Sequence, residues 1–259
     1  MELNGWCFDI EADNLYLQSK KIWYISLKSL DGKRKLQVFP FRDGRDGSKR
    51  ALEQWINSFD DNVHVVTFNG LGYDLWSLWK IIGIVPRVGK GGKDYLGDKI
   101  VQFVDGYVLS MYLNPNSPKH SLGHLSGEDE QSKINYRESL IDAGVMDKTA
   151  PKGYEFSFWN DRMIAYCDRD VDSTITVVKR LWKQAQEMYK DSWLHPSFRQ
   201  IQKDYFLYSA QTYTGVKFNI GKARKLVETI EAEMNRIKSE VDPKLPSRAL
   251  KAADQAFYK

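Results

Sequence analysis

The first 110 residues alternate short apolar runs with amphipathic segments. Runs rich in β-branched and aromatic residues predict five strands, at 6–10, 22–27, 36–39, 63–68 and 101–104. Apolar residues at helical spacing predict helices at 48–59, 75–84 and 107–113. Three strands come in succession and helices accompany the later ones, which indicates an α/β fold with a mixed five-stranded sheet flanked by helices.

The pattern changes after residue 114. Proline, glycine and serine residues predict a long loop over 114–158, with one short helix near 121–125. Helical periodicity returns over 160–188, with an apolar stripe that we expect to pack in the core. Two more helical stretches, at 197–212 and 220–241, end the pattern. We therefore expect a first domain over residues 1–190 and a helical extension over residues 191–259.

Composition constrains the class of protein more than its function. With 42% hydrophobic and 28% charged residues, the chain is typical of a folded globular protein, and global disorder is excluded. No apolar run approaches the roughly 18 residues of a membrane-spanning helix, and no basic-then-apolar leader follows Met1. We expect a cytoplasmic protein with no membrane partner. Cys7 and Cys167 can build neither a disulfide framework nor a zinc site.

The net charge of +4 is unevenly distributed. Residues 198–259 carry 12 lysines and arginines against 7 aspartates and glutamates, so the basic excess lies in the C-terminal quarter. A nucleic-acid partner fits such a segment. A solvated helix face fits it as well, and charge alone leaves both interpretations open.

Two carboxylates end the first predicted strand. Asp9 and Glu11 are two residues apart, so their side chains point to the same side of the strand. Carboxylates that share an apolar strand end repel each other and lose hydration, and a cation between them offsets both costs. A strand end at the surface also explains the pair, so the motif alone does not decide.

A third carboxylate follows the fourth predicted strand. In the segment 68–74, Phe-Asn-Gly-Leu-Gly-Tyr-Asp, a buried strand gives way to a helix. Ligands collect at such junctions in α/β sheets. Asp74 is equally able to cap the helix that begins at Leu75, which is an ordinary role for aspartate.

The long helix over 160–188 carries the remaining acidic residues. Tyr166 and Asp170 are four residues apart and share one helix face. Asp168, Asp170 and Asp172 would repel one another on a bare helix. A metal ion, arginines such as Arg169, or plain solvation would relieve that repulsion.

Taken in order, the three motifs resemble the DEDD exonuclease superfamily: Asp-x-Glu on the first strand, Asn…Tyr-Asp at a later strand–helix junction, and Tyr-x-x-x-Asp on a late helix. No histidine stands five residues before the last aspartate, so the tyrosine subtype is indicated. The similarity is greatest to the proofreading domain of phage-type family A DNA polymerases, and it covers about residues 1–188. It implies a ribonuclease H-like fold and, for a phage-encoded protein, a location in the host cytoplasm.

The resemblance also implies roles for individual residues. Asp9, Glu11, Asp74 and Asp170 would be the catalytic carboxylates that bind two divalent metal ions, Mg²⁺ or Mn²⁺, and Tyr166 would orient the attacking water. Asp9 would bridge the two ions, with Glu11 and Asp170 on the water-activating ion and Asp74 on the other. Hard cations prefer oxygen ligands, which agrees with an all-carboxylate set. One ion would activate water and the other would stabilise the leaving oxygen.

Further residues are expected to contact the substrate or to have structural roles. Leu15 and Asn69 are candidate contacts to the terminal nucleotides, and Tyr73 is a candidate for stacking on bases. Asp168 is expected to be a solvated bystander, and Asp105 is expected to cap the helix that follows it. The glycine-rich segment 89–93 lacks the spacing of a phosphate-binding loop, so we expect a basic turn there.

The leading hypothesis is therefore a 3′→5′ exodeoxyribonuclease that acts on the 3′ end of single-stranded DNA. A ribonuclease D-like enzyme that trims RNA is the first alternative, because it would use the same carboxylates. A non-catalytic DNA-binding or polymerase-assembly module is the second, although all five site residues are intact.

The end of the chain extends the resemblance. Residues 210–219, followed by the helix over 220–241, resemble the entry into the polymerase domain of the same family. This implies an exonuclease that is a fragment of a longer polymerase or one half of a split polymerase. The expected partner is a DNA polymerase subunit or the missing polymerase domain. We also expect residues after about 197 to pack loosely on the exonuclease core and to be dispensable for its activity.

Overall fold

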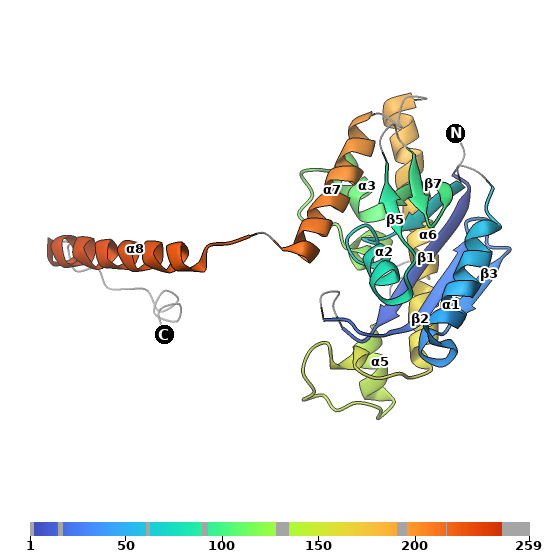
Figure 1. Cartoon of the computed structure of the whole chain (residues 1–259), viewed down its shortest axis with the longest axis horizontal. Helices are drawn as coiled ribbons and strands as arrows, with labels where there is room; N and C mark the ends of the chain where they lie inside the picture. The colour runs from blue at the N-terminus through green and yellow to red at the C-terminus, as the bar shows by residue number, and fades with distance from the viewer. Residues whose placement is uncertain are drawn as a thin grey trace. The chain divides into compact units, whose positions relative to one another are not determined.

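The computed structural model divides the chain into two units, Met1–Thr214 and Gly215–Lys259. The structure describes residues 3–14, 18–60, 63–89, 93–127, 135–190, 196–215 and 217–244. The first unit contains a sheet and the helices around it, and the second contains one long helix (Figure 1).

The sheet has seven strands, in the order β3-β2-β1-β4-β7-β6-β5. Their bounds are β1 Gly5–Ala12, β2 Ile22–Ser29, β3 Lys35–Val38, β4 Val63–Thr67, β5 Pro86–Val88, β6 Asp94–Leu96 and β7 Lys99–Asp105. The strands β1, β4 and β7 run parallel, and β2 and β6 pair with them in antiparallel fashion. The sheet is mixed, as expected.

The expected number of five strands was wrong, because β5 and β6 add a short hairpin beyond β7. Each of these strands has only three residues. Three residues carry too little alternation of apolar and polar positions to stand out in a sequence pattern.

The side chains of β1 alternate between two helical layers. Trp6 packs edge-on against Trp55 of α1 (Pro40–Asn57), whereas the Cys7 thiol donates to the Val171 carbonyl of α6 (Arg162–Tyr189). Since successive residues of a strand point to opposite faces, α1 and α6 cover opposite faces of the sheet (Figure 1). Asp9 and Glu11 therefore lie on the α6 face.

Several helices differ in extent from the sequence expectation. The helix expected at 75–84 is a short α2 (Asp74–Ser77) that continues as the π-helical turn η1 (Leu78–Ile82). The region 114–158 was expected to hold one short helix. Among its described residues it holds three helical elements: α4 Leu122–Ser126, α5 Tyr136–Asp142 and the 3₁₀ turn η3 Tyr154–Phe156.

The first unit ends later than the expected boundary at residue 190. The helix α7 (Pro196–Thr214) buries Phe198, Gln202 and Phe206 against α3 (Gly106–Leu113), the sheet and α2. The expectation that residues after 197 pack loosely is therefore wrong for α7. The two apolar side chains flank a buried glutamine, which hides the buried face from an analysis based on apolar spacing.

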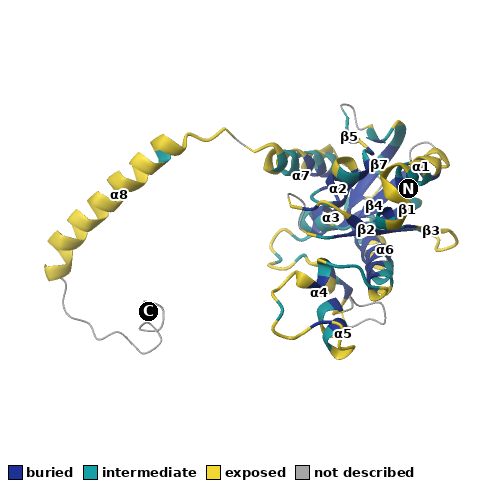
Figure 2. Cartoon of the chain, turned by 60° about the horizontal axis from the view of Figure 1, so that its bottom comes forward, coloured by how far each residue is buried: buried dark blue, intermediate teal, exposed yellow. Residues whose placement is uncertain are grey.

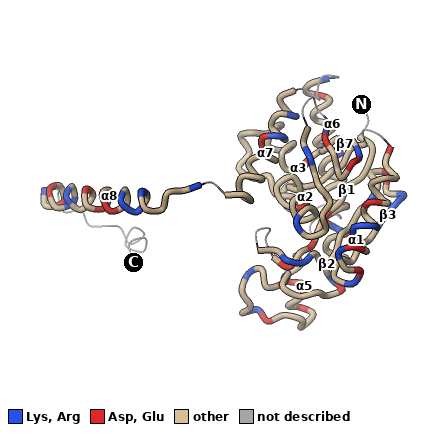
Figure 3. Tube along the Cα trace, in the orientation of Figure 1, with Lys and Arg blue, Asp and Glu red and all other residues tan. Residues whose placement is uncertain are grey.

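The second unit contains α8 (Ile220–Val241) and the turn η5 (Asp242–Lys244). No described residue of α8 is buried (Figure 2). Both basic and acidic residues lie along it (Figure 3). Across the described part of the chain, no helix has both the length and the apolar character needed to cross a membrane.

Candidate active site

The centre of the candidate site lies at the C-terminal end of β1. Asp9, Glu11 and Cys167 each place one possible ligand atom within 4.8 Å of the others. Glu11 is buried, and the pairing of β1 with β2 shifts register directly after it. The Cys167 thiol of α6 donates to Oδ2 of Asp9 at 3.7 Å, so this helix holds the Asp9 carboxylate in place.

The helix α6 brings Tyr166 and Asp170 to the same place. Both side chains are buried, and the Tyr166 hydroxyl donates to the Asp170 carboxylate. Burial raises the pKa of Tyr166, and the charges of Glu11, Asp170 and Asp9 raise it further. Tyr166 therefore lies among three of the carboxylates proposed from the sequence, and it stays protonated at any ordinary pH.

Asp74 lies near enough to the same centre for the charge of Asp9 to act on it. It begins α2, and no side-chain cap is formed at that helix start, so the simple capping interpretation does not describe it. Burial raises the pKa of Asp74 well above its ordinary value, and the charges of Asp9 and Asp105 add to the effect. Its Oδ1 is buried and has no hydrogen-bond partner among the described residues.

Asp105 organises the loop that carries Asp74. It caps α3, as expected, by accepting from the backbone N–H groups of Tyr107 and Val108. It also accepts from the N–H groups of Asn69 and Leu71, at 3.0 Å each. With the Thr67 hydroxyl, five donors bond to this carboxylate. Asp105 therefore holds the loop in place, and its oxygens are engaged by the protein instead of being available to a metal ion.

The loop after β4 depends on its glycine and on backbone strain. A Cβ on Gly70 would lie 2.4 Å from the Cβ of Thr67, so only glycine fits there. Asn69 takes a left-handed conformation with φ of 65°, which asparagine tolerates better than most residues. Its Oδ1 accepts from the Tyr205 hydroxyl of α7 at 2.5 Å.

A second link joins α7 to this loop through the edge of β7. The Gln202 side chain donates to the Phe103 carbonyl at 3.0 Å and accepts from the Asp105 N–H at 2.8 Å. The amide thus pairs with two backbone groups of β7 that lie beyond Val101, the last residue paired with β6. The helix expected to be dispensable is bonded to the residue that shapes the Asp74 loop.

The three candidate substrate contacts remain predictions. The Tyr73 hydroxyl donates to the Asn14 carbonyl at 2.9 Å, which connects the loops after β1 and β4. Burial raises the pKa of Tyr73, followed by the charges of Asp74 and Glu11. Asn69 is engaged by Tyr205, as above, and Leu15 lies outside the described residues.

Asp168 and Asp172 lie outside the carboxylate centre. Asp168 accepts from Tyr24 at 2.9 Å, from Ser26 at 2.5 Å and from Lys35 at 2.5 Å. Asp172 pairs with Lys28. The expectation of a solvated Asp168 was wrong, and lysines of the antiparallel strands relieve the repulsion that had been assigned to a metal ion, arginine or solvent.

Two residues beside the site do not stand out in the sequence. Cys167 was considered only for disulfides and zinc, although it contacts Asp9. Tyr136 of α5 stacks on Tyr166, with ring centroids 4.8 Å apart. Tyr136 falls in the region without periodicity, where no pattern could connect it to a helix 30 residues later.

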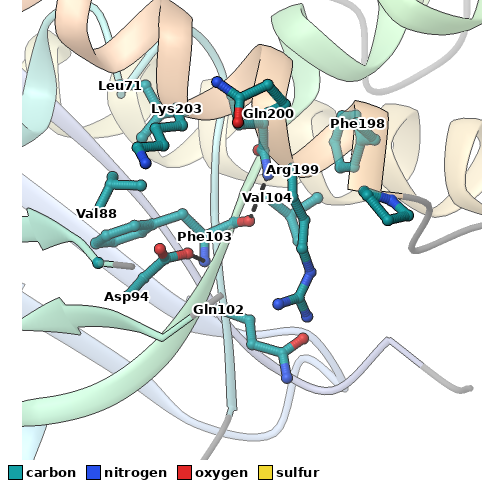
Figure 4. Close-up of a pocket in the computed structure, with 13 residues that line it drawn as sticks. Leu71, Val88, Asp94, Gln102, Phe103, Val104, Phe198, Arg199, Gln200 and Lys203 are labelled. Atoms are coloured by element: carbon teal, nitrogen blue, oxygen red, sulfur yellow. Dashed lines mark hydrogen bonds between the residues drawn. The ribbon is translucent and has the colours of Figure 1, made fainter. Parts of the chain in front are cut away.

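One cavity lies apart from the carboxylates. It measures about 410 Å³ and lies between α7 and the edge formed by β5, β6 and β7 (Figure 4). Asp94 accepts from the Phe103 N–H at its wall, and burial raises the pKa of this carboxyl. Of the loop that carries Asp74, only Leu71 lines the cavity.

Comparisons with known proteins agree with this architecture. Residues 6–87 match the model of a family described as RNase_H superfamily. No curated protein matches the chain. Among solved structures, Brucella melitensis NrnC superposes with a TM-score of 0.52 at 12% identity, over 81% of this chain and 85% of that one.

Two further solved structures give the same result. A structure of Brucella melitensis NrnC bound to pGG has a TM-score of 0.51 at 13% identity, covering 83% of this chain and 88% of that one. Trypanosoma brucei RNase D in complex with RNA U12 has a TM-score of 0.51 at 15% identity, covering 79% and 63%. The chain therefore has a ribonuclease H-like α/β fold that it shares with solved nucleases.

Proposed function

We propose that the chain is a metal-dependent 3′→5′ exonuclease whose active site is formed by Asp9, Glu11, Asp74, Tyr166 and Asp170. The convergence of carboxylates from β1 and α6 around one buried tyrosine, with the charge of Asp9 also acting on Asp74 of α2, carries this proposal. A cluster of buried acidic groups is costly for a folded chain. Such a cost is typical of a functional site.

The residues present fit divalent metal ions. The donors are carboxylate oxygens, which Mg²⁺ and Mn²⁺ prefer, and Asp74 has a buried oxygen without a partner among the described residues. Asp9, Glu11, Asp74 and Asp170 would hold the ions. When bound, two such ions would lower the pKa of a water molecule and neutralise charge on the phosphodiester.

Side chains of the protein would orient the water molecule and hold the carboxylates in place. Tyr166 keeps its proton because its pKa is raised, so its hydroxyl can orient a water molecule by hydrogen bonding but cannot act as an anionic base. The Cys167 thiol and the backbone around Glu11 fix the carboxylates, and Asp105 fixes the loop of Asp74. Positioning of this kind lowers the reorganisation that the reaction requires.

Short RNA is the substrate class that we propose first. One similar structure is bound to pGG and another is in complex with RNA U12, which supports a ribonuclease D-like activity over DNA proofreading. DNA is the second candidate, and the sequence resemblance of residues 1–188 and 210–219 to phage-type polymerases supports it.

The test is digestion of matched RNA and DNA oligonucleotides that carry a label at the 5′ or the 3′ end. We expect a ladder of products shortened from the 3′ end with Mg²⁺ or Mn²⁺, and none with chelator. Faster shortening of RNA supports the first candidate, and faster shortening of DNA supports the second. No metal-dependent shortening of either substrate would contradict the proposal.

We further propose that α8 docks on a polymerase module, either a separate subunit or further chain. Its exposed apolar residues include a set that recurs at spacings of seven, three and four, namely Ile220, Val227, Ile230, Met234, Ile237 and Val241. This spacing is typical of a helix that packs along another helix. Removal of residues 215–259 should abolish co-purification of a polymerase subunit while exonuclease activity is retained.

A further inference from the structure

We propose that Tyr136 of α5 is a positioning residue that holds the ring of Tyr166 against the carboxylates. The inference rests on the proposed exonuclease function and deepens it. Tyr136 lies outside the three sequence motifs, in the region between α4 and α6 that was expected to be mainly loop.

The two rings form a buried stack. Their centroids are 4.8 Å apart and their planes are inclined by 22°. Tyr136 is 4% exposed and Tyr166 is 7% exposed. The Phe156 ring packs against both, at 5.5 Å from Tyr136 and 6.2 Å from Tyr166. Aromatic contacts of this geometry are worth about 0.5–1.5 kcal/mol beyond the area they bury.

A hydrogen bond fixes Tyr136 to the start of the helix that carries Tyr166. The Asn160 side chain donates to the Tyr136 hydroxyl at 2.5 Å. The Oδ1 of Asn160 accepts from the N–H of Arg162, the first residue of α6. The face of the Tyr136 ring therefore stacks on a residue of α6, and its hydroxyl is bonded to Asn160, which in turn bonds to the first residue of α6.

The segment that supplies Tyr136 is itself anchored. The Arg137 guanidinium donates to the carbonyls of Ala150 and Pro151, at 2.5 and 3.1 Å. It also donates to the Glu155 carboxylate at 3.0 Å and forms a half-buried ion pair with it. The Trp23 indole of β2 donates to the Phe156 carbonyl at 2.8 Å. These bonds attach α5 and η3 to the sheet, so the stack has a rigid support.

This support forms a small apolar cluster separate from the main core. Its buried members are Trp23, Tyr24, Tyr136, Leu140, Met146, Met163, Tyr166 and Cys167. Two of them, Tyr166 and Cys167, contact the carboxylates directly. A helix side chain left without this cluster would gain rotamers, and a displacement of about 1 Å in a catalytic group can cost on the order of 100-fold in rate.

The test compares Tyr136→Leu with Tyr154→Leu in the full chain. Tyr154 lies in the same segment, is 49% exposed and packs on Phe158, away from Tyr166. For Tyr136→Leu we expect kcat to fall at least tenfold and KM to stay within twofold. Tyr136→Phe keeps the stack and should recover most of kcat. Tyr154→Leu should stay within twofold of wild type in both parameters.

A double-mutant cycle separates positioning from general destabilisation. In a Tyr166→Phe background the oriented hydroxyl is already absent, so Tyr136→Leu should cost less than threefold more in kcat. An equal loss of kcat in both backgrounds would overturn the proposal, because Tyr136 would then act independently of the Tyr166 hydroxyl.

A second readout does not depend on activity. In protein with isotope-labelled tyrosine, the ring resonance assigned by its loss in Tyr166→Phe should shift in Tyr136→Leu and stay in place in Tyr154→Leu. An unshifted Tyr166 resonance would contradict the stack. An inactive wild-type chain would refute the proposed exonuclease function, whereas the resonance would still decide whether Tyr136 holds Tyr166.

Discussion

The helices α7 and α8 follow each other in the chain but differ in how they are used. In α7, Phe198, Gln202 and Phe206 are buried, and Tyr205 bonds to the loop that carries Asp74. In α8 the apolar spacing is more regular, yet no described residue is buried. Regular amphipathicity therefore indicates that a helix has an apolar face, but it does not tell whether the chain itself covers that face.

The largest effect should come from two deletions that divide the chain on either side of α7. Removal of 197–259 takes away Gln202 and two buried aromatic rings, and it should abolish the cooperative unfolding transition and all nuclease activity. Removal of 215–259 should leave the midpoint of thermal unfolding within about 2 °C of wild type. If the 1–196 fragment were folded and active, the first unit would not need α7, just as it is expected not to need α8.

The second prediction concerns activity in both versions of the chain. Asp9→Asn should lower kcat by about 1,000-fold or more, because it removes one charge from the centre of the carboxylate cluster. The loss should be the same in the full chain and in residues 1–214, because the site lies in the first unit. Asp168→Asn is the matched control on α6, and it should retain most of the activity.

A third prediction sharpens the role of α7 with one side chain. Gln202→Ala leaves the Asp105 N–H and the Phe103 carbonyl without their partner, which should cost about 1–3 kcal/mol in the free energy of unfolding. Gln200→Ala removes only an exposed bond to Asp204 and should cost less than about 0.5 kcal/mol. Urea titrations of the two variants measure this difference. Equal free energies of unfolding would show that the Gln202 bonds do not help α7 to support the site.

A fourth prediction concerns how the free energy of unfolding depends on pH through Asp74. The pKa of Asp74 is raised in the folded chain by burial and by Asp9, so the ionised form destabilises the metal-free fold at neutral pH. Asp74→Asn should therefore stabilise the chain at pH 7 in chelator, by on the order of 1 kcal/mol or more. The gain should shrink as the pH falls toward the ordinary aspartate pKa of about 3.9. A pH-independent difference would argue against a raised pKa.

The smallest effect is expected on the apolar face of α8. Ile230→Asp should leave nuclease activity and the unfolding of the first unit unchanged, because no described residue of α8 is buried. The same change should abolish association with a polymerase module. Thr229→Asp, on the polar side of the helix, is the control, and equal losses of association from both variants would argue against docking through the apolar face.

Much of the site could be predicted because its residues lie in regular elements. Asp9 and Glu11 follow from the alternation of a strand, and Tyr166 and Asp170 follow from the spacing of a helix. Asp74 follows from a junction where the chain must turn through glycines. Each of these features depends on residues that are close together in the chain, so a short stretch of sequence is enough to predict it.

The parts that were missed depend on contacts between distant residues. Tyr136 meets Tyr166 across 30 positions, and Gln202 meets Asp105 across 97 positions. The lysines that neutralise Asp168 and Asp172 come from β2 and β3, far away in the sequence. Neither spacing nor composition contains such pairings, because only the folded chain brings them together.

The side-chain amide of Gln202 has a consequence for solubility. An unpaired strand edge offers a row of donors and acceptors to which strands of other molecules can add. The pairing of β7 with β6 stops at Val101, and Gln202 occupies the Phe103 carbonyl and the Asp105 N–H beyond it. The Asp94 carboxylate accepts from the Phe103 N–H, so the side chains of Gln202 and Asp94 together take the place of the next strand at this edge. Whenever α7 detaches, the buried β7 is the place where self-association of the chain would begin.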